Sequence, residues 1–381
     1  MDLDQRYPSI GDLAAAARRR IPRFAWEYLI SGIGAEAGLA RNRAALDAVT
    51  FRPRYLPVKK TSDPVLRTTL LGQQFALPFG ITPFGLSGLM WPKAAEIAAR
   101  SAARAGVPFG LSSFATTRME TVRELAGDNA WYQHYPVNDL ALQARMLADI
   151  ADAGYKVLIV TVDIPTDTRR DRDLRVGLSV PPRINLRSVC DIAVRPAWAL
   201  ATARAGMPEF VNLMPHIPVG LGRAGSARAL LDLMEGTVTQ KMLAELRDLW
   251  PGKLIVKGVL SPNDARVAQA IGVDGIWVSN HGGRQLDAAR APVEILPEIR
   301  AAVGRDMAIM ADSGARSGLD IARILARGAD FVFLGRAFIF AIAALGSRGG
   351  DHACHVLHQE LRAALGQIGC RRPDELHRFL D

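Results

Sequence analysis

The chain has 381 residues, of which 49% are hydrophobic and 22% charged, and its formal net charge is +9. This length suits one α/β barrel with additional segments, and the apolar content excludes a disordered chain. We expect no nucleic-acid binding, because the arginines are scattered and no zinc finger, helix-turn-helix cue or aromatic platform accompanies them. The positive charge favours anionic lipid surfaces and anionic small molecules instead.

The cysteines Cys190, Cys354 and Cys370 form no CxxC pair and have no histidine at metal spacing, so we predict neither a disulfide framework nor a metal site. The first residues lack the apolar segment of a signal peptide, and the apolar run at Phe338–Leu345 is too short to span a bilayer. We therefore expect a cytoplasmic protein, with peripheral attachment to the inner face of the cell membrane as the alternative.

Three helical patterns precede the first predicted strand, at Gly11–Arg20, Ile21–Ser31 and Ala35–Val49. The stretch Phe51–Leu71 that follows them is predicted to be extended. We expect these segments to cap or flank the main fold.

Eight short apolar runs end in glycine, proline or polar residues, and most are followed by helical periodicity, which is the pattern of βα units. The predicted strands are Leu77–Pro83, Pro108–Ser113, Trp131–Tyr135, Val157–Asp163, Lys253–Val259, Gly275–Asn280, Met307–Asp312 and Phe331–Gly335. Predicted helices between them include Ala94–Ala105, Leu140–Ala153, Pro262–Ile271, Val293–Val303 and Gly318–Ala326. This alternation favours an α/β fold, a single (β/α)8 TIM barrel over residues 1–381, rather than an open sheet.

One connection, from Asp163 to Lys253 after strand 4, is far too long for a βα unit and indicates an insertion at about residues 170–240. Its segment Arg175–Arg228 has seven arginines against Asp191 and Glu209. Among them lie the apolar residues Ile184, Leu186, Val189, Ile192, Trp198 and Phe210. This composition predicts docking on an anionic membrane, while packing on the barrel or a contact between subunits remains equally open.

The active site of such barrels lies at the carboxyl ends of the strands, where polar residues concentrate in this chain. Strands seven and eight end in the segments Gly314–Arg316 and Gly335–Arg336, directly ahead of helices, and barrels commonly bind phosphate there. We therefore predict a phosphorylated ligand. The alternative is that these glycines only turn the chain and that the arginines are solvated.

Two further residues at strand ends indicate redox chemistry. Lys257 follows a buried strand and needs an anionic partner, either a cofactor atom that gains negative charge on reduction or a carboxylate such as Asp312. His281 is followed by two glycines and Arg284, and Asp163 could fix its tautomer, as a general base requires. A metal role for His281 is not expected, because no second histidine lies at ligand spacing.

The segment Ser279–Gln285 closely resembles the signature of the FMN-dependent 2-hydroxy acid dehydrogenase and oxidase family, and the resemblance extends over nearly the whole chain. It implies FMN as cofactor and oxidation of a small (S)-2-hydroxy acid, of lactate or mandelate type, to the 2-oxo acid. The electrons would pass to a quinone or another acceptor in a dehydrogenase, or to O2 with formation of hydrogen peroxide in an oxidase. Two rivals are a non-catalytic phospholigand barrel and a flavin enzyme with another chemistry, but neither requires two arginines for a carboxylate. We also expect a homo-oligomer.

The resemblance also implies roles for individual residues. His281 would abstract the proton with Asp163 as its partner, and Tyr135 would lie beside the substrate hydroxyl. Tyr28, Arg170 and Arg284 would hold the substrate carboxylate. The implied FMN contacts are the backbone of Pro83, Phe84 and Gly85, the side chains of Ser112, Gln133 and Thr161 around the ring, Lys257 at the N1/O2 edge, Ser279 and Asp312 at the ribityl chain, and Gly314, Arg316, Gly335 and Arg336 at the phosphate.

Two differences from the oxidases indicate which branch of the family the chain resembles. Phe114 occupies the position of a tryptophan in glycolate oxidase, and Gly85 that of an alanine typical of the oxidases. The segments Leu89–Lys93, Arg195–Trp198 and Gly206–Pro208 are also similar to the mandelate and lactate dehydrogenase branch, in which the long crossover contacts the membrane. The sequence therefore favours a dehydrogenase and leaves lactate and mandelate open.

Overall fold

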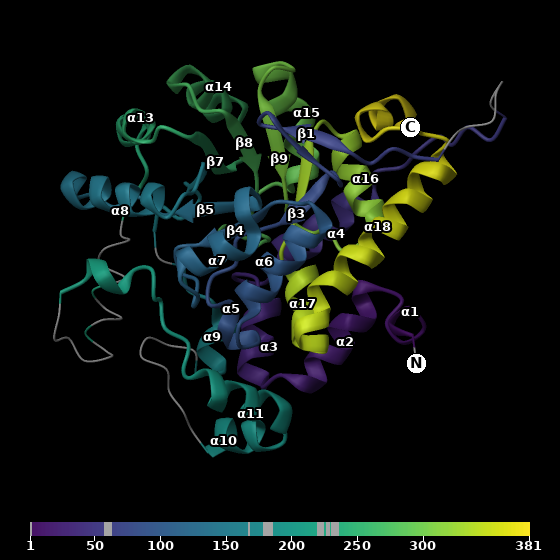
Figure 1. Ribbon diagram of the computed structural model, residues 1–381. Coiled ribbons are helices and arrows are strands. Elements are labelled where there is room, and N and C mark those ends of the chain that lie inside the picture. The colour runs from purple at the N-terminus through teal and green to yellow at the C-terminus, as the bar shows by residue number, and fades with distance from the viewer. Residues whose placement is uncertain are drawn as a thin grey trace.

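The computed structural model describes residues 2–56, 63–166, 168–177, 186–218, 225, 229 and 236–381 (Figure 1). A closed barrel of parallel strands lies at its centre, with neighbours in sequence order and the last strand paired with the first. The strands are β3 (Phe79–Ile81), β4 (Phe109–Ser112), β5 (Ala130–His134), β6 (Val157–Thr161), β7 (Lys253–Val259), β8 (Gly275–Val278), β9 (Ala308–Ala311) and β10 (Phe331–Leu334). The (β/α)8 barrel and all eight predicted strands are confirmed, with most boundaries shifted by one or two residues.

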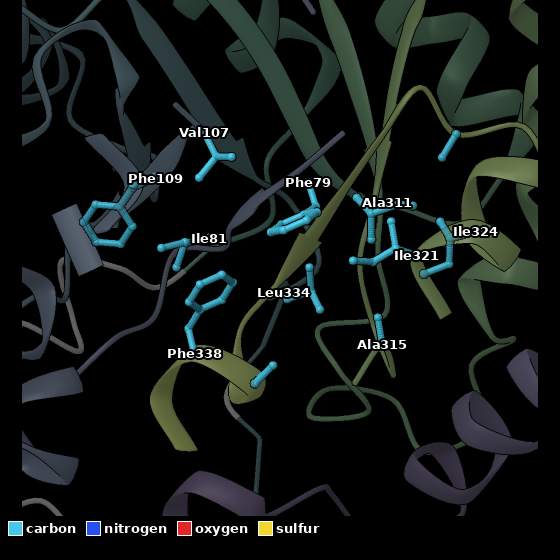
Figure 2. Packing of buried hydrophobic residues seen from close by; sticks show 14 of the residues in the cluster. Phe79, Ile81, Val107, Phe109, Ala311, Ala315, Ile321, Ile324, Leu334 and Phe338 are labelled. Carbon is cyan, nitrogen blue, oxygen red and sulfur yellow. The ribbon is translucent and has the colours of Figure 1, made fainter. Parts of the chain in front are cut away.

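Both faces of the barrel strands are buried, which explains why these strands are nearly continuous apolar runs. Alternate side chains fill the interior, where the rings of Trp277 and Phe333 stack with their centroids 4.0 Å apart. The opposite face packs against the outer helices, as Phe79 and Leu334 do in Figure 2. Such a filled barrel provides a rigid base for side chains at its mouth.

The helices around the barrel are α5 (Ser87–Met90), α6 (Ala94–Ala105), α7 (Met119–Ala126), α8 (Leu140–Asp152), α13 (Gln240–Leu249), α14 (Pro262–Ile271), α15 (Pro292–Val303), α16 (Gly318–Ala326), α17 (Arg336–Leu345) and α18 (Gly349–Ile368). The five predicted helices are confirmed as α6, α8, α14, α15 and α16. Their start signals are local. Ser261 caps α14, which begins with a proline, and Ser317 caps α16 through the N–H of Asp320.

The amino-terminal segment forms α1 (Leu3–Arg6), α2 (Ile10–Arg20), α3 (Arg23–Ile30) and α4 (Ala37–Asp47), which confirms the three predicted helices. Residues 57–62 of the stretch predicted to be extended lie outside the described residues. The same stretch enters an antiparallel hairpin of β1 (Thr68–Leu70) and β2 (Gln73–Phe75), which was not predicted. Phe75 packs edge-on against Trp131 and Phe331, so the hairpin closes the amino-terminal end of the barrel.

The long insertion contains α9 (Asp171–Arg175), α10 (Leu186–Ala193) and α11 (Pro196–Ala205), and the last two lie beside α3 at one end of the molecule (Figure 1). The prediction of apolar side chains free to enter a membrane is wrong for Trp198. This ring is buried, donates its N–H to the carbonyl of Leu89 over 3.1 Å and meets the ring of Phe24. Ile192 and Phe210 are also partly buried, whereas Ile184 lies outside the described residues.

The described residues contain no helix that is long and apolar enough to span a membrane.

Candidate active site

A cavity of about 1010 Å³ opens at the carboxyl ends of the barrel strands. Most predicted site residues line it. Of the remaining three, Gln133 and Ser279 are buried, and Asp163 is partly buried next to His281. The lining residues predicted from sequence are Tyr28, Pro83, Phe84, Gly85, Ser112, Tyr135, Thr161, Arg170, Lys257, His281, Arg284, Asp312, Gly314, Arg316, Gly335 and Arg336. Segments far apart in the sequence therefore meet at one site.

His281 and Asp163 form the pair that the sequence predicted. The imidazole Nδ1 lies 3.0 Å from Asp163 Oδ1, and the His281 backbone N–H donates to Ser279 Oγ over 3.0 Å. A bulge in β7 places Gly258 against Asp163, and a Cβ atom on Gly258 would lie 2.6 Å from that of Asp163. A glycine with a φ of +106° is therefore what allows the carboxylate to reach the histidine.

Burial and charge tune both members of the pair. Burial lowers the pKa of His281 below its ordinary value, although the charge of Asp163 acts in the opposite direction. Burial alone would raise the pKa of Asp163, but the charges of His281 and Lys257 hold this pKa below its usual range. An ionised Asp163 accepts a hydrogen bond from Nδ1, which leaves Nε2 as the proton acceptor and stabilises the imidazolium that forms.

Lys257 is 5% exposed and lines the cavity. Its ammonium donates to Ser279 Oγ over 3.3 Å, and Asp312 Oδ2 lies 3.7 Å away. Asp312 is engaged elsewhere, because its Oδ1 accepts hydrogen bonds from the hydroxyls of Ser279 and Ser313. The carboxylate alternative therefore accounts for only part of the environment of Lys257, and this cation retains donors for a ligand.

Arg284 and Arg170 meet on one wall of the cavity with Tyr28. Arg284 donates to the carbonyls of Tyr28 and Ser31 over 2.8 and 3.1 Å, and its guanidinium stacks 4.8 Å from the centroid of the Tyr28 ring. Burial, and next the charge of Arg170, lower the pKa of Arg284 to about 10. Two cations held so close together favour an additional anion.

Asp173 is a residue of this wall that the sequence analysis missed. Its Oδ2 lies 3.8 Å from Arg170 Nη1, and burial raises its pKa against the opposing charges of Arg284 and Arg170. Its place three residues after Arg170, on the same helical turn, was the signal that could have identified it.

Aromatic side chains form another wall of the cavity. Phe114 meets both Tyr135 and Phe210 edge-on, with ring centroids 5.3 Å apart in each case. Burial raises the pKa of Tyr135, so this phenol stays protonated and can donate a hydrogen bond. A Cβ atom on Gly85 would lie 3.3 Å from Phe114 Cβ, so the glycine keeps space at this wall. Phe210 comes from the insertion, which therefore contributes to the site.

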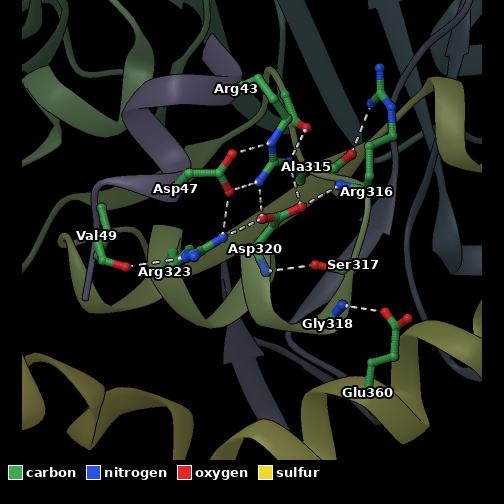
Figure 3. A network of polar contacts seen from close by, with 11 residues as sticks. Arg43, Asp47, Val49, Ala315, Arg316, Ser317, Gly318, Asp320, Arg323 and Glu360 are labelled. Carbon is green, nitrogen blue, oxygen red and sulfur yellow. Dashed lines mark hydrogen bonds and ion pairs between the residues drawn. The ribbon is translucent and has the colours of Figure 1, made fainter. Parts of the chain in front are cut away.

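A charged network fixes the loop after β9, which contains Gly314 and Arg316, at the other end of the cavity (Figure 3). Asp320 is 1% exposed and accepts two hydrogen bonds from Arg43, at 2.7 and 2.8 Å, and one from the backbone N–H of Arg316 at 2.9 Å. Arg43 also donates to the carbonyl of Gly314. The network thus connects α4 to the loop that the sequence assigned to a phosphate.

Arg336 follows β10 at the first position of α17 and is buried. It donates to the carbonyls of Leu29, Ser31 and Gly282 over 3.0, 2.8 and 3.0 Å. Burial, and next the charge of Arg316, lower the pKa of Arg336. Burial, and next the charge of Arg43, lower the pKa of Arg316 to about 10. A phosphate at this helix start would offset both effects.

Unpartnered polar atoms test whether the site fits a flavin nucleotide. Gln133 Nε2 and Thr161 Oγ1 are buried without a hydrogen-bond partner among the described residues. They belong to neighbouring strands, and Lys257 lies on the next strand along the barrel. A polar ring edge over these atoms, joined to a phosphate at Arg316 and Arg336, would satisfy both ends of the cavity. The residues present therefore fit FMN.

Known proteins agree with this geometry. The family described as FMN-dependent dehydrogenase matches residues 17–380. The chain is 38% identical to an L-lactate dehydrogenase of Caulobacter sp. (strain K31), over 98% of this chain and 97% of that protein. An L-lactate dehydrogenase of Xanthobacter autotrophicus is 37% identical to this chain, and the match covers 97% of this chain and 95% of that protein.

Solved structures are also similar to this chain over nearly its whole length. The crystal structure of the monotopic membrane protein (S)-mandelate dehydrogenase has a TM-score of 0.92 with 34% identity and covers 98% of both chains. A mandelate oxidase with (S)-2-phenylpropionate has a TM-score of 0.81 with 30% identity, also over 98% of both chains. This chain therefore belongs to the FMN-dependent dehydrogenase family.

Proposed function

We propose that this protein oxidises a small (S)-2-hydroxy acid, of lactate or mandelate type, to the 2-oxo acid and passes the electrons to a quinone or another acceptor. One observation carries the proposal. The His281–Asp163 pair and the Arg284–Arg170 pair open into the same cavity, so a proton acceptor and a carboxylate site face one small molecule. When bound, FMN supplies the two-electron acceptor.

Different residues would bind the substrate carboxylate and accept the substrate proton. Arg284, Arg170 and the Tyr28 phenol bind the substrate carboxylate and so turn the 2-hydroxy group toward His281. His281 Nε2 takes a proton from the substrate, and Asp163 stabilises the resulting imidazolium. Tyr135, kept protonated by burial, donates toward the substrate oxygen.

The cofactor contacts follow the same division. Gln133, Thr161, Ser112 and the Pro83–Gly85 backbone would surround the flavin ring, with Lys257 supplying positive charge at the edge that becomes electron-rich. Ser279 and Asp312 would hold the ribityl chain. Gly314, Arg316, Gly335 and Arg336 would hold the phosphate.

Two rivals are weaker on this geometry. A barrel that only binds a phospholigand gives no role to the buried His281–Asp163 pair or to the Arg284–Arg170 wall. An oxidase using O2 is compatible with the same site, but Gly85, in place of the alanine typical of the oxidases, favours the dehydrogenase that the sequence indicated.

The enzyme is tested by anaerobic mixing with a panel of 2-hydroxy acids, with flavin absorbance as the readout. We expect bleaching with the (S)-enantiomers of lactate or mandelate, recolouring with a quinone, and slow recolouring with little peroxide in air. A flavin that stays oxidised with every acid would refute the proposed reaction, and fast peroxide formation would make the protein an oxidase.

We also propose that the α10–α11 end docks on the inner face of the cell membrane. Val189 on α10 and Leu200 on α11 are each 52% exposed, and Val194 between the two helices is 63% exposed. Beside them Arg18, Arg19 and Arg195 line a groove of about 480 Å³. Exposed apolar groups next to cationic ones suit shallow insertion between anionic headgroups.

Co-sedimentation with anionic and neutral vesicles tests the docking. Leu200→Glu should release the protein from anionic vesicles, and high salt should do the same. Leu249→Glu is a matched control, because Leu249 is 44% exposed on α13, away from α10 and α11 (Figure 1). Equal pelleting of the two variants would place the membrane contact elsewhere.

A further inference from the structure

Arg172 lies at the start of the insertion, two residues after Arg170, and binds two carboxylates at once. Its Nε and Nη2 donate to both carboxylate oxygens of Glu36, each over 2.6 Å, and its Nη1 donates to Glu27 over 2.8 Å. Glu36 also accepts the backbone N–H of Gly32 over 3.1 Å. The side chains of all three members are at most 35% exposed. A bidentate guanidinium–carboxylate contact fixes orientation as well as distance.

The two carboxylates come from segments that build the substrate wall. Glu27 directly precedes Tyr28 on α3. Glu36 has a φ of +63°, a left-handed conformation that is uncommon outside glycine, and begins α4. The turn between them contains Ser31, whose carbonyl accepts hydrogen bonds from both Arg284 and Arg336. The same turn contacts the histidine loop, because the N–H of Ile33 donates to the carbonyl of Gly283.

Arg172 therefore joins three segments near the substrate wall: its own segment, α3 with Glu27, and the start of α4 with Glu36. Its own segment carries Arg170 and Asp173, whereas Glu27 and Glu36 carry the Tyr28 and Ser31 side of the wall. Arg170 has only a long contact, 3.8 Å, to Asp173, and its Nε is buried without a hydrogen-bond partner among the described residues. Its position thus depends on the backbone that Arg172 anchors.

We propose that Arg172, through Glu36 and Glu27, is a positioning residue that holds Arg170 opposite Tyr28 and Arg284, so that all three meet the same substrate carboxylate. Arg172 itself does not line the cavity. This inference rests on the proposed function and extends it, because it makes substrate binding depend on an ion-pair cluster outside the cavity.

The test is anaerobic reduction of the FMN-loaded Arg172→Gln variant, which separates the substrate Kd from the limiting reduction rate. We expect Kd to rise about tenfold to a hundredfold, with a smaller fall in the limiting rate, because a displacement of about 1 Å at a binding group has effects of that order. Phenylacetate, a carboxylate that cannot be oxidised, should bind more weakly by a similar factor. FMN content and the visible spectrum should match those of the wild type.

Arg175→Gln is the matched control. Arg175 lies on the same short helix, but its side chain is 74% exposed and its contact to Asp171 is 3.7 Å long. We expect its Kd to stay within about twofold of the wild type, as for most exposed ion pairs. Arg172→Lys should restore part of the loss, because an ammonium can still pair with one carboxylate.

A double variant tests the mechanism. If Arg172 acts through Glu36, Glu36→Gln should raise Kd like Arg172→Gln, and combining the two should add little. Glu27→Gln, which leaves the bidentate contact, serves if the other variants fold poorly, and it should raise Kd to a smaller extent. An unchanged Kd in Arg172→Gln, or in Glu27→Gln where only that variant folds, overturns the inference, as does full additivity. If no 2-hydroxy acid reduces the flavin of the wild-type protein, the proposed function is overturned instead.

Discussion

The two ends of the cavity are both lined by buried arginines, but they are built differently. At the phosphate end, the backbone N–H of Arg316 donates to Asp320, and the Arg336 side chain donates to three backbone carbonyls. At the substrate end, Asp163 Oδ2, Arg170 Nε and Asp173 Oδ1 are buried without hydrogen-bond partners among the described residues. The Arg336 side chain at the phosphate end is thus held mainly by bonds within the protein, whereas the substrate end has more buried groups without partners.

The two ends therefore suit two kinds of ligand, a cofactor that stays bound and a substrate that exchanges. A resident group benefits from a rigid site that is organised before it binds, whereas a substrate that comes and goes must supply the missing contacts itself. Changes at the substrate end should therefore alter rate and substrate affinity while FMN stays bound. Changes at the phosphate end should alter stability and FMN retention.

His281→Gln should have the largest effect. The variant should retain FMN and bind substrate, yet reduce its flavin about 10²- to 10⁴-fold more slowly, because the group that accepts the proton is gone. Stopped-flow absorbance under anaerobic conditions measures this. Near-normal reduction would remove His281 from the reaction.

Arg284→Lys should rank second. An ammonium cannot reproduce a bidentate contact with a carboxylate, nor the two bonds to the carbonyls of Tyr28 and Ser31. We expect about a hundredfold loss in the ratio of reduction rate to Kd, with FMN content unchanged. Loss of FMN together with activity would show that the two ends are not separable.

Asp320→Asn probes the phosphate end. It removes the charge that faces Arg43 and Arg316, and we expect a loss of about 2 kcal/mol in stability, less than for fully buried pairs because Arg43 is partly exposed. FMN should dissociate more readily in a fluorescence titration. The substrate Kd of the loaded variant should stay close to that of the wild type, and a large change there would contradict the division between the ends.

The pH dependence of flavin reduction should give the smallest effect. Because burial lowers the pKa of His281, its imidazole stays neutral below the ordinary histidine pKa of about 6.5, so the rate should fall only at lower pH. Asp163 raises the pKa of His281, so Asp163→Asn should move this acid limb to still lower pH while reducing the maximum rate. A limb that moves upward would contradict the assigned pair.

The barrel was predictable because its strands are buried on both faces and end in residues that only a site requires. The segment from His281 to Arg284 carries its chemistry in adjacent positions, so the sequence alone indicated a site. The hairpin at Thr68–Phe75 was missed because its strands have three residues each, too few for a periodic pattern.

Other parts could not be predicted because their partners are distant in sequence. Nothing near Arg172 indicates that it binds Glu36, which lies 136 positions earlier. For Trp198 and Phe210 the sequence left a membrane surface and packing on the barrel equally open, because an amphipathic composition does not say which apolar side chains the barrel covers. The exposed Val194 and the buried Trp198 differ in packing, not in residue class.

The contacts of Arg284 and Arg336 with the amino-terminal segment also set an order of assembly. Their acceptors on Tyr28, Leu29 and Ser31 lie between 253 and 307 positions earlier in the chain. The ribosome therefore releases these acceptors long before it makes either arginine, and the apolar face of α2, with Leu13 and Ala17, must wait for α17. Folding that depends on contacts of such long range is slow. The Tyr28–Ser31 segment can therefore make these contacts only after residues 284 and 336 have been synthesised, and both ends of the cavity depend on this long-range docking.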